Sequence, residues 1–264
     1  MGRGLVLTLR SSFETPASAV AAAGSSEPVT FSIFAYFDMS PGAPVKLYSG
    51  PLSMFGMKAE IAAREKGLDF ELIMVPFDMQ RLYQPKHPEV ARVNPKQQVP
   101  VLIHGDVEIF DSTQIFEYFE HLKPDPALWP AEPAARARAR LLELKSDEVY
   151  FPPIIRLMSL QQTPADPAAV AAREAAAHFY DEMEAQLRDR MFLAGSFSYA
   201  DIAFYMAQLF GARMGAPMTD AHPRLKQWRD RMTARPAVRS VVATMAAFLR
   251  AHGRPLPDFM QGVA

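Results

Sequence analysis

The spacing of apolar residues predicts a strand, a helix and a second strand where the patterned part of the chain begins. Residues 45–48 alternate as a short strand, which a Ser-Gly-Pro turn ends. Apolar residues then recur at helical spacing from Met54, and Gly67 stands where the residue after a helix often lies. Residues 70–75 form an apolar run of strand length. This β-α-β order favours a parallel pair of strands with a right-handed crossover.

A hairpin and a helix are expected next, after an irregular, proline-containing stretch over residues 76–98. Residues 100–103 and 107–110 have the pattern of strands, and a His-Gly-Asp turn joins them. From Thr113 the apolar residues lie on one helical face until a Lys-Pro pair ends the helix. We therefore expect a first domain over residues 44–125.

Every pattern after Pro133 is helical, which predicts a second, all-helical domain over residues 131–256. Ser198 and Asp201 have the spacing of a capping box. The nearly continuous apolar run from Ile202 to Phe210 predicts that this helix is the buried centre of the second domain. A cluster of prolines marks the boundary between the domains. The other expected helices cover residues 134–144, 168–187, 222–234 and 237–252.

Composition and charge exclude several classes of protein. The 264 residues suffice for two ordinary domains, and the formal net charge of −1 gives no field that attracts nucleic acid or an anionic membrane. The chain has no cysteine, so any thiol chemistry must use a thiol carried in by the ligand. Its six histidines are scattered, so we expect no metal site. No apolar stretch approaches the roughly 20 residues that span a bilayer.

The first 43 residues differ from the rest in composition. They are rich in Ala, Ser and Gly, contain Arg3 and Arg10, and have few acidic residues. This composition resembles a transit peptide, but it also fits a disordered tail or a chain whose true start is Met39. We expect a disordered extension over residues 1–43.

The pair Val99-Pro100 stands at the start of a predicted strand, where a proline is tolerated because no ladder donor is needed. An ordinary trans bond is the common state of such a pair. A cis bond would instead turn the backbone of Val99 outward, so that it could pair with a peptide ligand as an added strand does. The residues alone do not decide between the trans and the cis bond.

Asp111 and Ser112 stand at the start of the helix that follows the hairpin. Asp111 and Gln114 could form a plain N-terminal cap. Alternatively, the free N–H groups of the helix start could bind a carboxylate while the acidic side chain pairs with an ammonium group. A ligand with an α-amino acid head would satisfy both partners.

Ser53 closes the turn Ser49-Gly50-Pro51-Leu52-Ser53, just before the first helix. It could be an N-terminal cap, or its hydroxyl could donate to a ligand thiolate with help from the helix dipole. A free thiol has a pKa near ~8.5, and lowering it by about two units needs only ~2.7 kcal/mol of preferential stabilisation.

Four local motifs, in this order, resemble the cytosolic glutathione transferase family. They are Ser49-Gly50-Pro51-Leu52-Ser53 before Lys58-Ala59-Glu60-Ile61-Ala62, Asn94-Pro95-Lys96-Gln97-Gln98-Val99-Pro100-Val101-Leu102, Phe110-Asp111-Ser112-Thr113-Gln114-Ile115, and Phe197-Ser198-Tyr199-Ala200-Asp201-Ile202-Ala203. The resemblance runs from about Val45 to Leu249. It implies an α+β thioredoxin-like domain (β-α-β-β-β-α) followed by an all-α helical bundle.

The resemblance also implies roles for particular residues. Ser53 matches the catalytic serine of the serine-type, bacterial-like members, although Met54-Phe55 replace the Pro or small residue that often follows it. Tyr48 and Ser49 are rival hydroxyls for activating the thiol. The residues that the resemblance assigns to glutathione are Lys86, His87, Gln98, Val99, Pro100, Asp111 and Ser112, with Pro100 in a cis bond. Candidates for the second-substrate pocket between the domains are Tyr150, Phe151, Arg156 and Met158.

The expected function is therefore conjugation of the glutathione thiolate to an electrophilic, hydrophobic substrate, with glutathione as cosubstrate and no metal. The family resemblance further implies a cytoplasmic homodimer active in detoxification. Two alternatives remain: a non-enzymatic glutathione-binding or scaffold protein of the same fold, and a glutathione-dependent lyase, etherase or dehalogenase.

Overall fold

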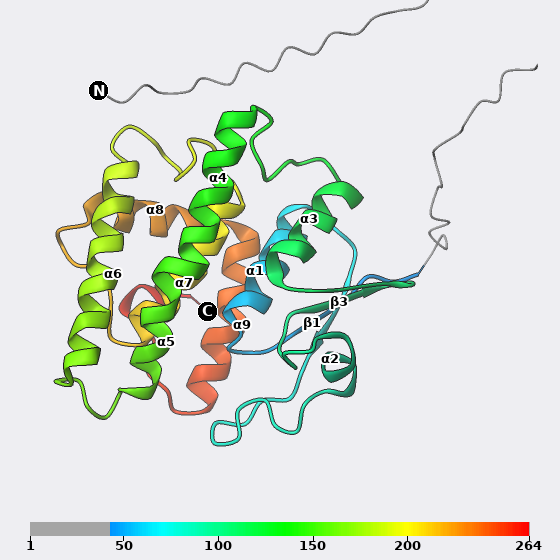
Figure 1. Cartoon of the computed structure of the whole chain (residues 1–264), viewed down its shortest axis with the longest axis horizontal. Helices are drawn as coiled ribbons and strands as arrows, with labels where there is room; N and C mark the ends of the chain where they lie inside the picture. Colours follow the sequence, from blue (N-terminus) through cyan, green and yellow to red (C-terminus); the bar gives the residue numbers. More distant parts are fainter. Residues whose placement is uncertain (1–42, 264) are drawn as a thin grey trace, which may run out of the picture. The chain divides into compact units, whose positions relative to one another are not determined.

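The computed structural model describes residues 43–263, and the expected extension over residues 1–43 lies outside them except for Ala43. Figure 1 shows a small sheet with its helices beside a group of longer helices. The four strands are β1 (Lys46–Ser49), β2 (Glu71–Met74), β3 (Val101–His104) and β4 (Val107–Phe110). They form one mixed sheet in the order β2-β1-β3-β4. β1 and β2 are parallel, whereas β1/β3 and β3/β4 are antiparallel.

Three helices complete the first domain, and their ends follow the local sequence. α1 (Met54–Glu65) starts at the Ser53 cap, and Gly67 follows it with a φ of 59°. α3 (Ser112–Leu122) starts at an Asp111 cap. The sheet and helices confirm the expected α+β domain. The short α2 (Pro88–Val93) lies inside the stretch expected to be irregular, where His87 caps it and a proline occupies its first turn.

The second domain is helical, as expected. Its elements are α4 (Pro133–Lys145), the π-helical turn η1 (Ser146–Tyr150), α5 (Phe151–Ser159), α6 (Pro167–Gln186), α7 (Tyr199–Arg213), α8 (Pro223–Ala234), α9 (Pro236–Ala251) and the 3-10 turn η2 (Asp258–Met260). Most of these helices carry a proline in the first turn, where the missing N–H costs nothing. The hydrophobic pattern did not predict α5, which continues directly from the π-helical turn.

The α7 helix lies at the centre of the second domain. The predicted capping box forms between Ser198 and Asp201, and the apolar run behind it is buried. Besides the Ser198 backbone N–H, the buried Asp201 carboxylate accepts hydrogen bonds from the Leu193 backbone and the Trp228 indole. Burial nevertheless raises the pKa of Asp201 to about 6. Asp201 therefore fixes the start of α7, and its side chain is fully buried from solvent.

The two domains share one hydrophobic core. α1 packs against α3 of its own domain and against α7 and α9 of the helical domain. The rings of Phe116 and Tyr199 stack across the boundary with centroids 3.7 Å apart. The Arg235 guanidinium forms an ion pair with Glu65 over 2.7 Å. α1 therefore has a fixed position relative to the helical domain, and so does the residue that caps it. Within residues 43–263, no helix has the length and apolar character that crossing a membrane requires.

Candidate functional site

A cavity of about 830 Å³ lies beside the start of α1. Its wall includes the loop between β2 and α2, the start of α1, parts of α5 and α7, and the segment after α9. Such a volume suits a peptide-sized or drug-sized ligand. Most of the wall is apolar, and Ser53 is one of the few small polar residues in it.

Ser53 is both the cap of α1 and part of the cavity wall. Its Oγ accepts a hydrogen bond from the Gly56 N–H over 3.0 Å, and the residue is 9% exposed. Because this bond uses an oxygen lone pair, the hydroxyl proton stays available to donate. The helix start adds a favourable field for a negative charge. The capping role and thiolate stabilisation are therefore compatible in one side chain.

The two rival hydroxyls do not line the cavity. Ser49 is fully buried, and its Oγ lies against Gly56 with no hydrogen-bond partner in the part of the chain that the structure describes. Tyr48 is 5% exposed and packs against the ring of His87. Burial, and then the charges of Glu89 and Glu71, raise the pKa of Tyr48. Neither hydroxyl is placed to donate to a ligand in the cavity as Ser53 is.

The segment before β3 is held in an ordered turn. The Asn94 side chain donates to the Gln98 carbonyl over 2.6 Å and accepts from the Lys96 N–H over 2.9 Å. The Val99-Pro100 bond is cis, as the resemblance implied. Gln98 and Val99 line the cavity. Two other residues assigned to glutathione, Lys86 and His87, line it as well, whereas Pro100 does not.

Asp111 and Ser112 are not among the residues that line this cavity. Asp111 is exposed, has a φ of 78°, and accepts hydrogen bonds from the N–H groups of Thr113 and Gln114. A positive φ at a non-glycine residue costs free energy, and such strained residues cluster at functional sites. Ser112 is buried, and its carbonyl accepts a hydrogen bond from the Tyr199 hydroxyl over 3.1 Å. The helical domain thus holds the start of α3 in place.

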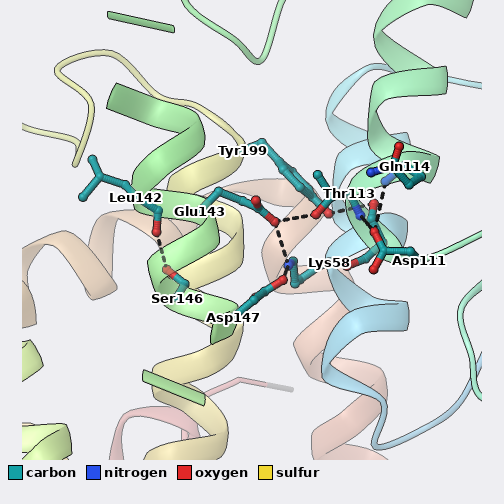
Figure 2. Close-up of polar contacts among 10 residues, drawn as sticks. Lys58, Asp111, Thr113, Gln114, Leu142, Glu143, Ser146, Asp147 and Tyr199 are labelled. Atoms are coloured by element: carbon teal, nitrogen blue, oxygen red, sulfur yellow. Dashed lines mark hydrogen bonds and ion pairs between the residues drawn. The ribbon is translucent and has the colours of Figure 1, made fainter. Parts of the chain in front are cut away.

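A buried ionic cluster supports this same helix start, and the sequence analysis did not identify it (Figure 2). Lys58 of α1 is 1% exposed and lies 3.2 Å from Glu143 and 2.5 Å from Asp147. The hydroxyl of Thr113 donates to the same Glu143 oxygen over 2.6 Å. The feature of the sequence that could have indicated this cluster is a lysine on the apolar stripe of α1, four residues after Met54.

The charged groups within the cluster shift one another's pKa values. Burial lowers the pKa of Lys58, but the two carboxylates outweigh it and the net shift is upward, so the ammonium stays charged. Burial raises the pKa of Asp147 to about 6; Lys58 opposes this rise, whereas Glu143 and Asp111 add to it. One buried cation faces two carboxylates, which disfavours the second negative charge.

The expected second-substrate residues divide into two groups. Phe151 and Met158 line the cavity. Tyr150 does not: it is 1% exposed and hydrogen-bonded to the Tyr180 hydroxyl inside the helical domain. Arg156 is exposed and also lies outside the cavity wall. The helical domain instead contributes Arg213, at the end of α7, and Arg254, after α9, to the cavity wall. Sequence reasoning missed both because their distance from the site depends on how the helices pack.

Within residues 43–263, no three His, Cys, Asp or Glu side chains lie together as a metal site would require.

Comparison with known proteins identifies the family. Residues 47–127 match the family model for the glutathione S-transferase N-terminal domain, and residues 148–236 match that for the C-terminal domain. Glutathione S-transferase 3 of Zea mays is 33% identical over 214 residues, which cover 77% of this chain and 95% of the maize protein.

Solved structures agree with the sequence matches. A glutathione S-transferase from Rhodospirillum rubrum is 27% identical, with a TM-score of 0.65 over 75% of this chain and 91% of the other. One from Methylobacterium radiotolerans, solved in complex with glutathione sulfonate, is also 27% identical, with a TM-score of 0.64 over 75% of this chain and 94% of the other.

A thioredoxin-like sheet joined to a helical bundle is the fold that this chain shares with these glutathione S-transferases. The chain belongs to the glutathione S-transferase family. It is a glutathione transferase.

Proposed function

We propose that Ser53 stabilises the thiolate of bound glutathione, which then attacks an electrophilic carbon of an apolar substrate in the same cavity. The observation that carries this proposal is the place of Ser53, a helix cap whose hydroxyl proton is free and which lies in the cavity wall. The rival hydroxyls of Tyr48 and Ser49 are buried away from that wall.

The chemistry requires little beyond thiolate stabilisation and proximity. The thiol proton leaves to solvent, and the sulfur forms a bond to carbon. In a substitution, the leaving group departs with its electron pair, whereas in an addition the product carbanion takes up a proton. Lowering the thiol pKa by about two units corresponds to ~2.7 kcal/mol, which one oriented hydroxyl and a helix start can supply.

We assign the remaining parts of glutathione to residues of the cavity wall and of the start of α3. Lys86, His87 and Gln98 lie where they can receive the glycine carboxylate, and the Val99 backbone, at the cis Pro100, pairs with the cysteinyl part. Asp111 receives the γ-glutamyl ammonium, and the start of α3 at Ser112 receives its carboxylate. Phe151 and Met158 contact the electrophile. Tyr150 and Arg156 act on it at most indirectly, because neither lines the cavity.

We further propose that the protein works as a homodimer in the cytoplasm. The cosubstrate must be in its thiol form, and the cytosol is kept reducing by its glutathione pool. A homodimer is supported by exposed apolar side chains on α4 and η1, which are Leu141, Leu144 and Val149.

Replacing Ser53 tests the proposal. For Ser53→Ala we expect kcat/KM for conjugation of a generic aromatic electrophile to fall by about 100-fold, because the thiolate loses its donor. The pKa of bound glutathione, followed by the ultraviolet absorbance of the thiolate, should rise toward the free value of ~8.5. Steady-state kinetics and titration of the complex measure the two effects.

The controls separate catalysis from folding. Ser53→Asn retains a capping oxygen but has no hydroxyl, so it should keep the stability of α1 and still lose activity. Full activity in Ser53→Ala, together with its loss in Ser49→Ala, would remove Ser53 from the mechanism. Glutathione binding without conjugation across a broad panel of electrophiles would favour a scaffold protein of this fold.

A further inference from the structure

The described wall of the cavity carries four cationic side chains and no acidic one. The cations are Arg81, Lys86, Arg213 and Arg254, and none of them takes part in the ion pairs found among residues 43–263. Glutathione itself carries two carboxylates, so Lys86 has a partner in the function proposed above. Arg81, Arg213 and Arg254 have no acidic partner among the described residues.

Of these four cations, Arg213 is the one with a buried hydrogen-bond donor that no described acceptor meets. It is the last residue of α7 and is partly buried, with its guanidinium 5.6 Å from the centroid of the Phe210 ring. Its Nη1 atom is buried and has no hydrogen-bond partner among residues 43–263, and burial lowers the pKa of the group. Burying an N–H donor of a cation without an acceptor is costly, and an anion in the cavity would remove that cost.

Tyr83 supplies a second donor in the wall of the same cavity. Burial raises the pKa of Tyr83 to about 12, and the Leu52 backbone and then the charge of Arg213 partly oppose this rise. At neutral pH the hydroxyl is therefore protonated and can donate. A guanidinium and a phenol hydroxyl in one cavity wall offer two donors to one carboxylate.

The position of Arg213 assigns this anion to the second substrate. Arg213 comes from the helical domain, as do its neighbours in the wall, Phe151, Met158 and Met214. The residues assigned to glutathione come from the first domain. Apolar side chains around one arginine suit an apolar molecule that carries a single acidic group.

We propose that Arg213, assisted by the Tyr83 hydroxyl, binds a carboxylate of the second substrate, so that the enzyme prefers apolar electrophiles bearing a carboxylate over their neutral counterparts. This inference rests on the proposed function, since it concerns the substrate of the same cavity.

A matched pair of electrophiles tests the preference. One is an α,β-unsaturated aryl ketone that carries a carboxymethyl ether, and the other is its methyl ester, in which the reacting carbon is unchanged. We expect Arg213→Met to lower kcat/KM for the acid by about ten- to hundredfold, the range for loss of a charge-assisted hydrogen bond, and for the ester by less than about twofold. Tyr83→Phe should lower it for the acid by a smaller factor.

Binding measurements make the result independent of turnover. The saturated analogues of the same acid and ester cannot react, and calorimetry on the glutathione-loaded protein reports their affinities. We expect Arg213→Met to weaken binding of the saturated acid and not that of the ester. If the wild type bound the acid selectively but conjugated neither electrophile, the proposed catalysis would fail while this inference stood.

Two controls complete the test. Arg239→Met removes an exposed cation of α9 that does not line the cavity, and it should leave both electrophiles unaffected. Arg213→Lys keeps the charge and should retain part of the preference. Equal losses for acid and ester in Arg213→Met would overturn the inference. A large rise in the KM of glutathione in that variant would also overturn it, because the carboxylate bound by Arg213 would then belong to glutathione.

Discussion

Gly50 and Tyr83 show how a single residue shapes the cavity. Gly50 lies in the turn that leads to Ser53, and the Tyr83 ring occupies the space that a Cβ of residue 50 would need. Tyr83 itself forms part of the cavity wall. A side chain at residue 50 would therefore displace this ring and reshape the cavity, although residue 50 itself does not line it.

We expect Gly50→Ala to displace the Tyr83 ring and to cost about 1–3 kcal/mol of unfolding free energy, as overpacking commonly does. The KM of a carboxylate-bearing electrophile should rise more than that of glutathione, because Tyr83 and Arg213 are the residues assigned above to its carboxylate. Urea unfolding and steady-state kinetics measure these effects. Gly262→Ala is the matched control, since nothing lies within 4 Å of a Cβ built there. Wild-type values in both variants would contradict the role given to this contact.

At the scale of elements, local patterns predicted the order of most strands and helices. The alternation in β1, the capping box of α7 and the turns around β3 and β4 depend on neighbouring residues, so the sequence alone reveals them. The pattern did not predict α2, whose six residues are too few for a periodic signal, or α5, which continues from a π-helical turn. The partners of Lys58 and the position of Arg213 depend on packing between distant segments, which no local pattern encodes.

The Lys58 cluster connects three elements to the helix start that carries Asp111 (Figure 2). Lys58 is in α1, Glu143 in α4 and Asp147 in η1, and Thr113 adds α3 through its hydroxyl. Removing one partner of a buried ion pair leaves an uncompensated charge and is strongly destabilising. Changes in this cluster should therefore alter stability and the start of α3 together.

The protonation of Asp147 predicts how stability depends on pH. Burial raises its pKa from an ordinary 3.8 to about 6, so the folded chain holds this proton more tightly than the unfolded chain does. The stability that this group contributes is complete below about pH 4 and is lost as the pH rises through about 6. Asp147→Asn does not titrate. The unfolding free energy of the wild type minus that of the variant should thus fall by about 1–3 kcal/mol between pH 4 and 7.

Urea unfolding at unit pH steps measures this difference. Gln227→Ala, in which an exposed uncharged residue of α8 is replaced, provides the control and should give a difference that is flat over the same range, because neither side chain titrates. A wild-type advantage that grew with pH would show that the attraction of Lys58 outweighs burial, and the stated direction would be wrong.

At the scale of the whole molecule, the surface of α4 and η1 distinguishes the helical domain from an ordinary solvated bundle. Leu141 and Leu144 are 55% and 52% exposed, and they are three residues apart on one face of α4. Val149 of η1 is 54% exposed. Large apolar side chains gathered on neighbouring turns favour contact with another protein surface, which is the basis of the homodimer proposed above.

We expect the double substitution Leu141→Lys and Leu144→Lys to convert the homodimer into a monomer. Two charges in a face that is buried in the dimer would cost far more than they do in water. Sedimentation velocity at micromolar concentrations measures the change. Met191→Lys alters an equally exposed apolar residue elsewhere and should leave the dimer intact. A wild-type chain that sediments as a monomer, or a double variant that still dimerises, would contradict the proposed interface.

The buried Lys58 also limits which domains can be combined with one another. Its two counter-ions both lie in the helical domain, whereas the lysine belongs to the thioredoxin-like domain. A chimera that joined this first domain to the helical domain of another transferase would bury a bare ammonium, unless the donor had carboxylates at the positions of Glu143 and Asp147. The two domains are therefore compatible only where their buried charges match. A stable chimera would need this lysine and its two carboxylates to be present together.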